Sequence, residues 1–317
     1  MENPESTFDQ SAFRAEPEAQ PEISAERDSE ATIAERLMTS MAAEVNETLG
    51  EKVVGPDGRL KMFMYRDAFP DKNKVSADMG VIRTIKAKWA GLKSPLAKEK
   101  EIARLGLSSH VAKRSNEQQL EVILRAQELE QAGRAGNLAE VAATILLHRG
   151  LQEKFVVVRA AAYDDIKHGL DTMMVNKETG EIVCAFDEVM GGKNDQRVEE
   201  KRKRQQEAIE RGGVDLDYGF TIQDGKMVKQ SFQHVPVFRL QLGRVEVNAA
   251  LTESDSTEGL GPLGEQMLGG LINSLEQQTA EYLANPNVKP AMREKLERYQ
   301  SGSLVDMRAT LQANKAA

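Results

Sequence analysis

Two neighbouring segments, Leu170–Val175 and Ile182–Val189, are apolar on both of the faces that an extended chain presents. Side chains alternate between the two faces of a strand. One face would carry Met173, Val175, Val183 and Ala185, and the other Met174, Ile182, Cys184 and Phe186. Strands of this kind need cover on both faces, whereas a strand that is apolar on one face can leave the other in water. We therefore predict an α/β fold in which helices lie on both sides of a mixed sheet.

The segments around this pair predict the order of the elements. Leu138–His148 is apolar on several sides, as in a buried helix, and Phe155–Ala161 is an apolar run typical of a buried strand. A highly charged helix is predicted after Asn194, and Val235–Leu242 is predicted as the last strand. A hairpin that turns at Asp224-Gly225 precedes this strand. The predicted order is helix, three strands, helix and strand, with one inserted hairpin.

The rest of the chain divides by composition and by helix signals. Residues 1–30 are rich in Pro, Glu and Ser and predict a disordered acidic tail. We predict a helical region with a small hairpin over 31–136, an α/β core over 137–243 and a helical C-terminal region over 244–317. In the second segment, Ser115 and Gln118 have the spacing of a capping box at a helix start, and Trp89 is predicted to anchor the core.

Two acidic motifs, Gly169-Leu170-Asp171 and Asp187-Glu188-Val189, lie in the predicted core, and with the order of its elements they resemble the core of the PD-(D/E)XK nuclease superfamily. There an acid opens the second strand, often after a glycine, and a second acid lies on the third strand two residues before a lysine. Gly169-Leu170-Asp171 matches the first motif. Asp187-Glu188-Val189 matches the second, except that valine stands in place of lysine. The resemblance covers about a third of the chain and implies a restriction-endonuclease-like αβββαβ fold with metal-dependent cleavage of nucleic acid.

Strand pairing gives a separate reason to expect a metal site. If the loop Lys177–Gly180 is a type I turn with Gly180 in the left-handed conformation, Met173 pairs with Ala185, Val175 with Val183 and Asp171 with Asp187. Directly opposite side chains share a face, so the two carboxylates would repel each other unless a cation lay between them. Ligands that are all oxygen suit Mg²⁺. We predict that Asp171 and Asp187 bind Mg²⁺; the alternative is that both are solvated strand ends near loops.

Further residues are candidates for the same site. By the resemblance, Glu188 would assist catalysis, and Lys193 or Lys167 would replace the missing lysine. Glu140 is either the helical glutamate that many members of the superfamily direct at the metal or part of a capping box with Asn137. His168, beside Gly169, is either a base or an incidental loop residue, and Asp164-Asp165 either support the site or cap a loop.

The charged helix after Asn194 is a candidate for substrate binding. Arg197, Lys201 and Arg204 have the spacing of one helix face and could contact phosphates. Alternatively the face is simply solvated, because Glu199 with Lys203 and Glu200 with Arg204 are favourable pairs four residues apart.

Composition narrows the class of protein. The net charge is −8, of which −7 lies in residues 1–30, so the rest of the chain is near neutral and leaves room only for a local basic patch. No stretch is apolar enough to span a bilayer, so we expect no membrane association. Cys184 is the one cysteine, which excludes an intrachain disulfide and favours a cytoplasmic location.

Two other functions stay open. A catalytically inactive nuclease-like fold could serve as a structural or protein-binding module, with the acidic tail or the C-terminal helices as contact segments. A phage-related virion or scaffold protein is the third class. The segments from Tyr163–Ile166 through Asp187–Val189, with the later strand Val235–Phe238, also resemble a module of uncharacterised bacterial proteins, and that resemblance implies no activity.

Overall fold

The computed structural model describes residues 21–92, 94–107, 109–131, 134–191, 196–257 and 259–316. The helices are α1 (Pro21–Leu49), η2 (Met62–Tyr65), α2 (Lys74–Trp89), α3 (Pro95–Arg104), α4 (Ser109–Ala112), α5 (Asn116–Gln131), α6 (Ala135–Leu151), α7 (Ala162–His168), α8 (Gln196–Arg211), α9 (Arg244–Ser256), α10 (Pro262–Ala284), α11 (Pro290–Arg298), η3 (Tyr299–Ser303) and α12 (Leu304–Ala316). The strands are β1 (Phe155–Arg159), β2 (Thr172–Asn176), β3 (Ile182–Met190), β4 (Val214–Gln223), β5 (Lys226–Val235) and β6 (Val237–Leu242).

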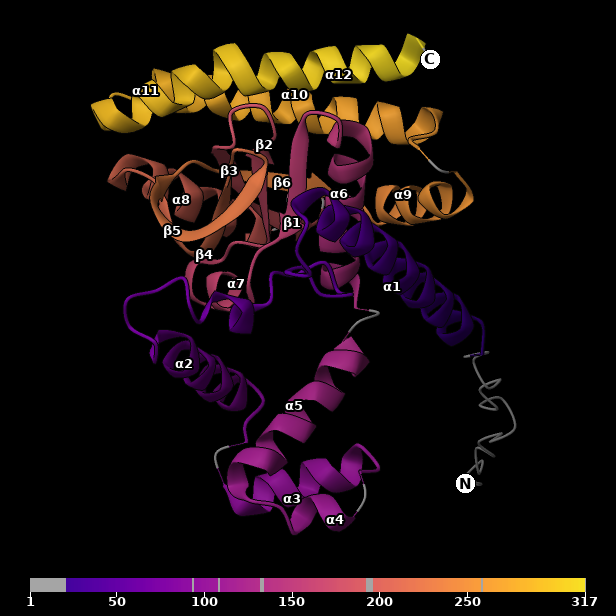
Figure 1. The fold of residues 1–317 in the computed structure, drawn as a ribbon. Helices are drawn as coiled ribbons and strands as arrows, with labels where there is room; N and C mark the ends of the chain where they lie inside the picture. Colours follow the sequence, from indigo (N-terminus) through magenta and orange to yellow (C-terminus); the bar gives the residue numbers. More distant parts are fainter. Residues whose placement is uncertain are drawn as a thin grey trace, which may run out of the picture.

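Four strands form the central sheet, in the order β1-β2-β3-β6. The strand β2 runs antiparallel to both β1 and β3, and β6 runs parallel to β3. The strands β4 and β5 form a separate hairpin, and Figure 1 shows helices packed around the sheet. The predicted α/β class and the mixed four-stranded sheet are therefore confirmed, and so is the hairpin, whose turn residues Asp224 and Gly225 both have positive φ.

Both faces of the sheet are covered, as its apolar strands require. On one face α6 packs against the strands, and the Thr144 hydroxyl of α6 lies 2.9 Å from the Thr172 hydroxyl of β2. The C-terminal helices adjoin α6 and lie together along one side of the molecule (Figure 1). On the other face, Lys201 of α8 reaches β3, and Ile222 of β4 donates its N–H to the Gly180 carbonyl at 2.9 Å. The sheet is thus a buried middle layer.

The turn between β2 and β3 follows the sequence prediction in most respects. Gly180 has φ +70°, and Met173 pairs with Ala185 as expected. A Cβ at residue 180 would lie 1.8 Å from the Ile222 carbonyl oxygen, so only glycine fits there. The predicted pair of Val175 with Val183 is wrong, because a bulge after Met174 pairs Val175 with Ile182 instead.

Each edge of the sheet is also protected. Beside β1, the Arg159 N–H donates to the Gly58 carbonyl at 3.0 Å, and the Leu60 N–H donates to the Arg159 carbonyl at 3.2 Å. Beside β6, the buried Gln278 amide of α10 bonds both backbone groups of Arg239 at 2.9 Å. These contacts satisfy backbone groups of one residue on each edge strand, which interrupts the row of free groups that another chain could pair with.

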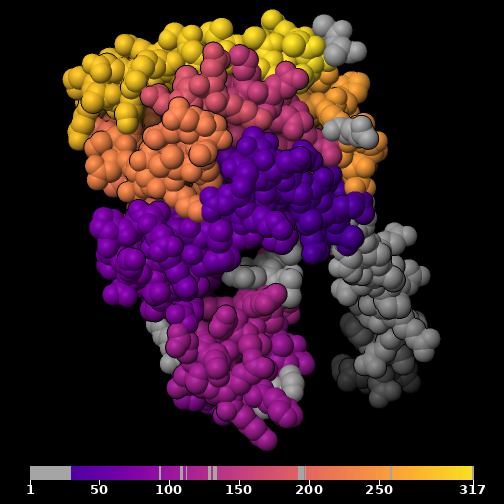
Figure 2. All heavy atoms as spheres, in the orientation of Figure 1, coloured from indigo at the N-terminus to yellow at the C-terminus, as the bar shows by residue number. Residues whose placement is uncertain are grey.

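The described residues form two hydrophobic cores. The large core includes residues of α1, the sheet and the C-terminal helices, so these three parts of the chain share one interior. The small core, built around Leu92, Ile102, Val111, Ile123 and Leu124, belongs to a helical lobe that we define as residues 90–131. The lobe extends away from the main body (Figure 2). Among the described residues, no helix has the length and apolar character needed to cross a membrane.

Several predicted boundaries change in the N-terminal half. The helix α1 begins at Pro21 rather than at residue 31, while residues 1–20 of the predicted tail lie outside the described residues. The predicted hairpin after Gly50 is reduced to a bridge between Val54 and Leu60, followed by η2. The capping box of Ser115 and Gln118 is confirmed by two hydrogen bonds of 3.3 Å.

Two predictions about single elements are wrong. Trp89 is no core anchor, because it is 67% exposed at the end of α2. The chain between β1 and β2 is not a simple connection but holds the helix α7, which ends at Gly169 in the left-handed conformation. The charged residues of this segment gave no apolar helical stripe, although Gly169 is a typical helix end.

We predict that Gln278→Ala lowers the free energy of unfolding by about 1–3 kcal/mol, because it leaves the two Arg239 backbone groups without partners. Urea denaturation followed by circular dichroism measures the loss. The control is Gln277→Ala, one residue away on the exposed face of α10. Equal stabilities of the two variants would contradict this role.

Candidate functional site

Asp171 lies at the start of β2 and is fixed through its backbone and its side chain. Its N–H donates to the Phe186 carbonyl at 2.8 Å, and its carbonyl accepts the Ala160 N–H at 2.8 Å. Its side-chain oxygen Oδ2 accepts the Glu188 N–H at 2.8 Å. The carboxyl group is buried, and burial together with the charge of Glu188 raises its pKa well above the usual range. Asp171 is therefore held against β3, beside the acids of that strand.

Asp187 lies on β3 and contacts a lysine from α8. The Lys201 ammonium donates to Asp187 Oδ1 and, at 2.6 Å, to the Glu188 carbonyl. Burial works against the charge of Lys201, but the carboxylates of Asp187 and Asp171 outweigh it and raise the pKa. The ammonium therefore stays protonated at neutral pH.

Glu188 is the most unusual of these acids. It is only 4% exposed, and neither oxygen of its carboxyl group is in hydrogen-bonding geometry with a described residue, although Thr172 and Asp171 lie beside it. Burial and the charge of Glu140 raise its pKa to about 8. Buried carboxyl oxygens without partners are rare and need a proton, a water or an ion.

Glu140 belongs to this charged group and not to a capping box. The helix α6 begins at Ala135, so Asn137 and Glu140 lie inside the helix and the predicted capping role is wrong. Glu140 pairs with Arg159 of β1 and, at 3.5 Å, with Arg59. Arg59 also pairs with Asp165 at 2.9 Å.

Charge balance is the main physical property of the cluster. It holds five carboxyl groups, those of Glu140, Asp165, Asp171, Asp187 and Glu188, and three cations, Arg59, Arg159 and Lys201. If all were ionised, two negative charges would be in excess in a largely buried place. Either protons on Asp171 and Glu188 or one divalent cation would remove this excess.

The remaining predicted residues fall in different places. Lys193 lies outside the described residues, and the side chain of Arg197 is likewise not described. Lys167 is exposed on α7. Arg204 is exposed and, with Glu200, Lys203 and Glu207, lines an open hollow on the outer face of α8.

The ion pairs of α8 differ in part from the sequence expectation. Glu199 pairs with Arg202 at 2.9 Å rather than with Lys203. Lys201 was expected to meet phosphates beside Arg204, but its ammonium is turned towards β3.

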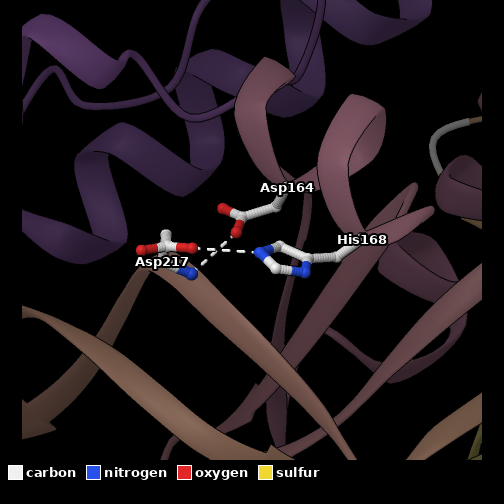
Figure 3. Close-up of side chains that lie close together, drawn as sticks. All are labelled: Asp164, His168 and Asp217. Atoms are coloured by element: carbon white, nitrogen blue, oxygen red, sulfur yellow. Dashed lines mark hydrogen bonds and ion pairs between the residues drawn. The ribbon is translucent and has the colours of Figure 1, made fainter. Parts of the chain in front are cut away.

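A second cluster lies between α7 and β4. Asp164, His168 and Asp217 each offer a ligand atom, all within 4.8 Å of one another, and among the described residues they form a group that could hold a metal ion (Figure 3). His168 Nε2 lies 3.0 Å from Asp217 Oδ2. Asp164 accepts the backbone N–H groups of Asp217 at 2.7 Å and Tyr218 at 3.1 Å.

This second cluster is already well satisfied without a metal. Lys74 of α2 places its ammonium 2.8 Å from Asp217 Oδ1 and 2.8 Å from Asp78 Oδ2. Asp164 is fully buried, and burial raises its pKa to about 7 despite its two backbone hydrogen bonds. The sequence signal for the cluster was the spacing of Asp164 and His168, four residues apart on α7. The third member, Asp217, comes from a distant strand, and no local pattern marks it.

No family model, curated protein or solved structure matches the chain.

The raised pKa of Glu188 predicts how stability depends on pH. The unfolded chain ionises this residue near its usual pKa, whereas the folded protein keeps the proton up to about pH 8. Between these values the folded state binds more protons, so stability falls as pH rises. Glu188→Gln removes this contribution, and we expect its unfolding free energy, in EDTA, to fall less between about pH 5 and pH 8 than that of the parent.

The control for this measurement is Glu181→Gln, an exposed position one residue before the same strand. It should keep the pH dependence of the parent. Asp164, whose pKa is also raised, contributes to all three proteins alike, so the comparison reports Glu188 together with its effect on the pKa of Asp171. Parallel curves for the parent and Glu188→Gln would show that Glu188 ionises normally.

Proposed function

We propose that the protein is a Mg²⁺-dependent phosphodiesterase that acts on nucleic acid. The observation that carries the proposal is the gathering of Asp171, Asp187 and Glu188 at one end of the β2–β3 hairpin with the ammonium of Lys201. In support, α6, the central strands and α8 follow one another in the order of the core that the sequence resembles, apart from two insertions, the helix α7 after β1 and the hairpin β4–β5 before β6.

The residues present fit a divalent cation. The cluster has an excess of carboxyl groups, and among the described residues nothing lies in hydrogen-bonding geometry with the oxygens of Glu188, although Thr172 and Asp171 lie beside it. Asp171 and Asp187 would be the ligands, with Glu188 beside them. A bound Mg²⁺ would supply activation of water and neutralisation of charge on the phosphate.

Lys201 would take the role of the lysine that Val189 replaces in the motif. It comes from α8 rather than from β3, but its ammonium reaches the acid of the third strand. Because the neighbouring carboxylates keep it protonated, it would donate a hydrogen bond to a phosphate oxygen instead of accepting a proton from water. We therefore assign the missing function to Lys201, in place of the predicted Lys193 or Lys167.

A second candidate function is a nuclease-like core without catalysis that serves as a structural or protein-binding module. Burial of Asp171, Asp187 and Glu188 favours this candidate, because a substrate needs access to the metal. Lys201 already neutralises Asp187, and two arginines already pair with Glu140. In this case the acids would stay neutral by holding protons.

Metal binding separates the two candidates. We expect titration calorimetry to show Mg²⁺ or Mn²⁺ binding by the parent, and the double variant Asp171→Asn/Asp187→Asn to bind at least about tenfold more weakly. Asparagine keeps the size of the side chain and an acceptor for the Glu188 N–H. Asp217→Asn, in the second cluster, is the matched control and should bind as the parent does.

The outcomes of this experiment point in different directions. Loss of binding in the double variant alone would support the proposal and justify cleavage assays, in which Lys201→Met should bind metal but cleave poorly. If only Asp217→Asn loses metal binding, the metal site is the second cluster and not the Asp171/Asp187 cluster. If the parent binds neither Mg²⁺ nor Mn²⁺, the proposed phosphodiesterase is wrong and the non-catalytic structural or protein-binding module is the remaining candidate.

A further inference from the structure

A cavity lies where the segment 57–63 meets α2 and the start of α7. Its volume is about 300 Å³, at the small end of the range for ligand pockets. Its lining includes Phe63 and Met79, which are 52% and 40% exposed. Exposed aromatic and thioether side chains at the mouth of a cavity are typical of a surface that binds a flat apolar group.

The rim of this cavity is basic. Arg59, Lys61 and Arg83 line it with Asp57, and because Arg59 is already paired with Glu140 and Asp165, Lys61 and Arg83 are the cations that would meet an anion. Arg83 pairs with Glu117, but both side chains are partly or largely exposed, and such pairs are weak enough to open for a stronger anion. A flat apolar group with an attached anion therefore fits the cavity.

The surrounding sequence is strongly basic, although the whole chain is acidic. Residues 72–90 contain five lysines and arginines and one acid, against a net charge of −8 for the whole chain. This segment holds α2, whereas the helical lobe beside it is near neutral, because the glutamates of α5 offset its cations. A local excess of this size attracts a polyanion and makes its binding sensitive to salt.

The helix α2 connects the cavity to the lobe. Met79, Ile82, Lys86 and Trp89 recur at helical spacing along one stripe, with Lys88 next to Trp89. Trp89, at 67% exposure, presents most of its ring to solvent. Aromatic rings that alternate with cations are the pattern by which proteins hold single-stranded nucleic acid, since bases stack on the rings while cations meet the phosphates.

We propose that α2 and the cavity bind single-stranded nucleic acid, with one base in the cavity against Phe63 and another on Trp89. The cavity accepts one flat group at a time. An unpaired base can leave the neighbouring bases and enter it, whereas a base within a stacked pair cannot. This inference deepens the proposed function by naming its substrate class. Arg59 lines the cavity and pairs with Asp165 and Glu140, so a strand held there lies beside the carboxyl cluster.

Fluorescence anisotropy with a labelled oligothymidine of about 16 nucleotides tests the proposal. The titrations are done in EDTA, so that metal binding plays no part. We expect Phe63→Ala and Trp89→Ala each to weaken binding about tenfold, the loss of one stacked base. Lys88→Glu should also weaken binding and reduce its dependence on salt.

Two matched variants control for general effects of substitution. Val245→Ala removes an exposed apolar side chain on α9, and Lys226→Glu reverses an exposed charge at the β4–β5 turn. Both should bind the oligonucleotide as the parent does. Circular dichroism of every variant checks that the fold is kept. Lys88→Glu, on the exposed side of α2, tests the binding surface without removing an aromatic side chain.

The proposal is overturned if the parent does not bind, if the aromatic variants bind like the parent, or if a duplex of the same length binds as tightly as the single strand. These failures differ from failure of the metal site. Phe63→Ala should keep the calorimetric metal binding of the parent, while Asp171→Asn/Asp187→Asn should keep oligonucleotide binding in EDTA.

Discussion

The structure depends on a sheet that is buried on both faces and contacted by other segments at both edges. Once β2 and β3 are apolar on each side, helices must cover them, and α6 and α8 do so from opposite faces. The same burial sets the chemistry at the end of the hairpin. Carboxyl groups in that place are poorly solvated, so each one needs a hydrogen bond, a cation or a proton.

The protein meets this need unevenly. Asp171 accepts a backbone N–H, Asp187 has Lys201, and Glu140 has two arginines, but the carboxyl oxygens of Glu188 have no such partner. The second cluster shows the opposite situation. There Lys74 neutralises Asp217, and backbone groups satisfy Asp164. Similar residue types therefore give one cluster with unsatisfied carboxyl oxygens and one satisfied cluster, and the first is the better candidate for chemistry.

Local sequence patterns predicted the parts of the site that strand pairing determines. The apolar alternation of the hairpin and the glycine at residue 180 were enough to pair Met173 with Ala185, which brings Asp171 next to β3. Glu140 was misassigned because α6 begins a few residues earlier than its capping signal suggested. Lys201 was grouped with Arg197 and Arg204 on a face that would meet phosphates or solvent, since a sequence does not give the rotation of a helix against a sheet.

Other members of the site depend on contacts between distant parts of the chain. Arg59 reaches Glu140 only because its segment pairs with the edge of β1. Asp217 joins Asp164 and His168 only through the packing of the β4–β5 hairpin on α7. Neither contact leaves a periodic signal in the sequence, because each is decided by the tertiary fold.

The helical lobe has a core of its own, and that core is small. Few apolar side chains hold α3, α4 and α5 together, whereas the body shares one large interior. Local opening costs least where the fewest buried contacts are lost. Among the described residues, the lobe is therefore the part expected to open locally while the sheet stays intact. A polymer that binds across the lobe would have to order it, and the binding affinity would fall as the free-energy cost of that ordering rises.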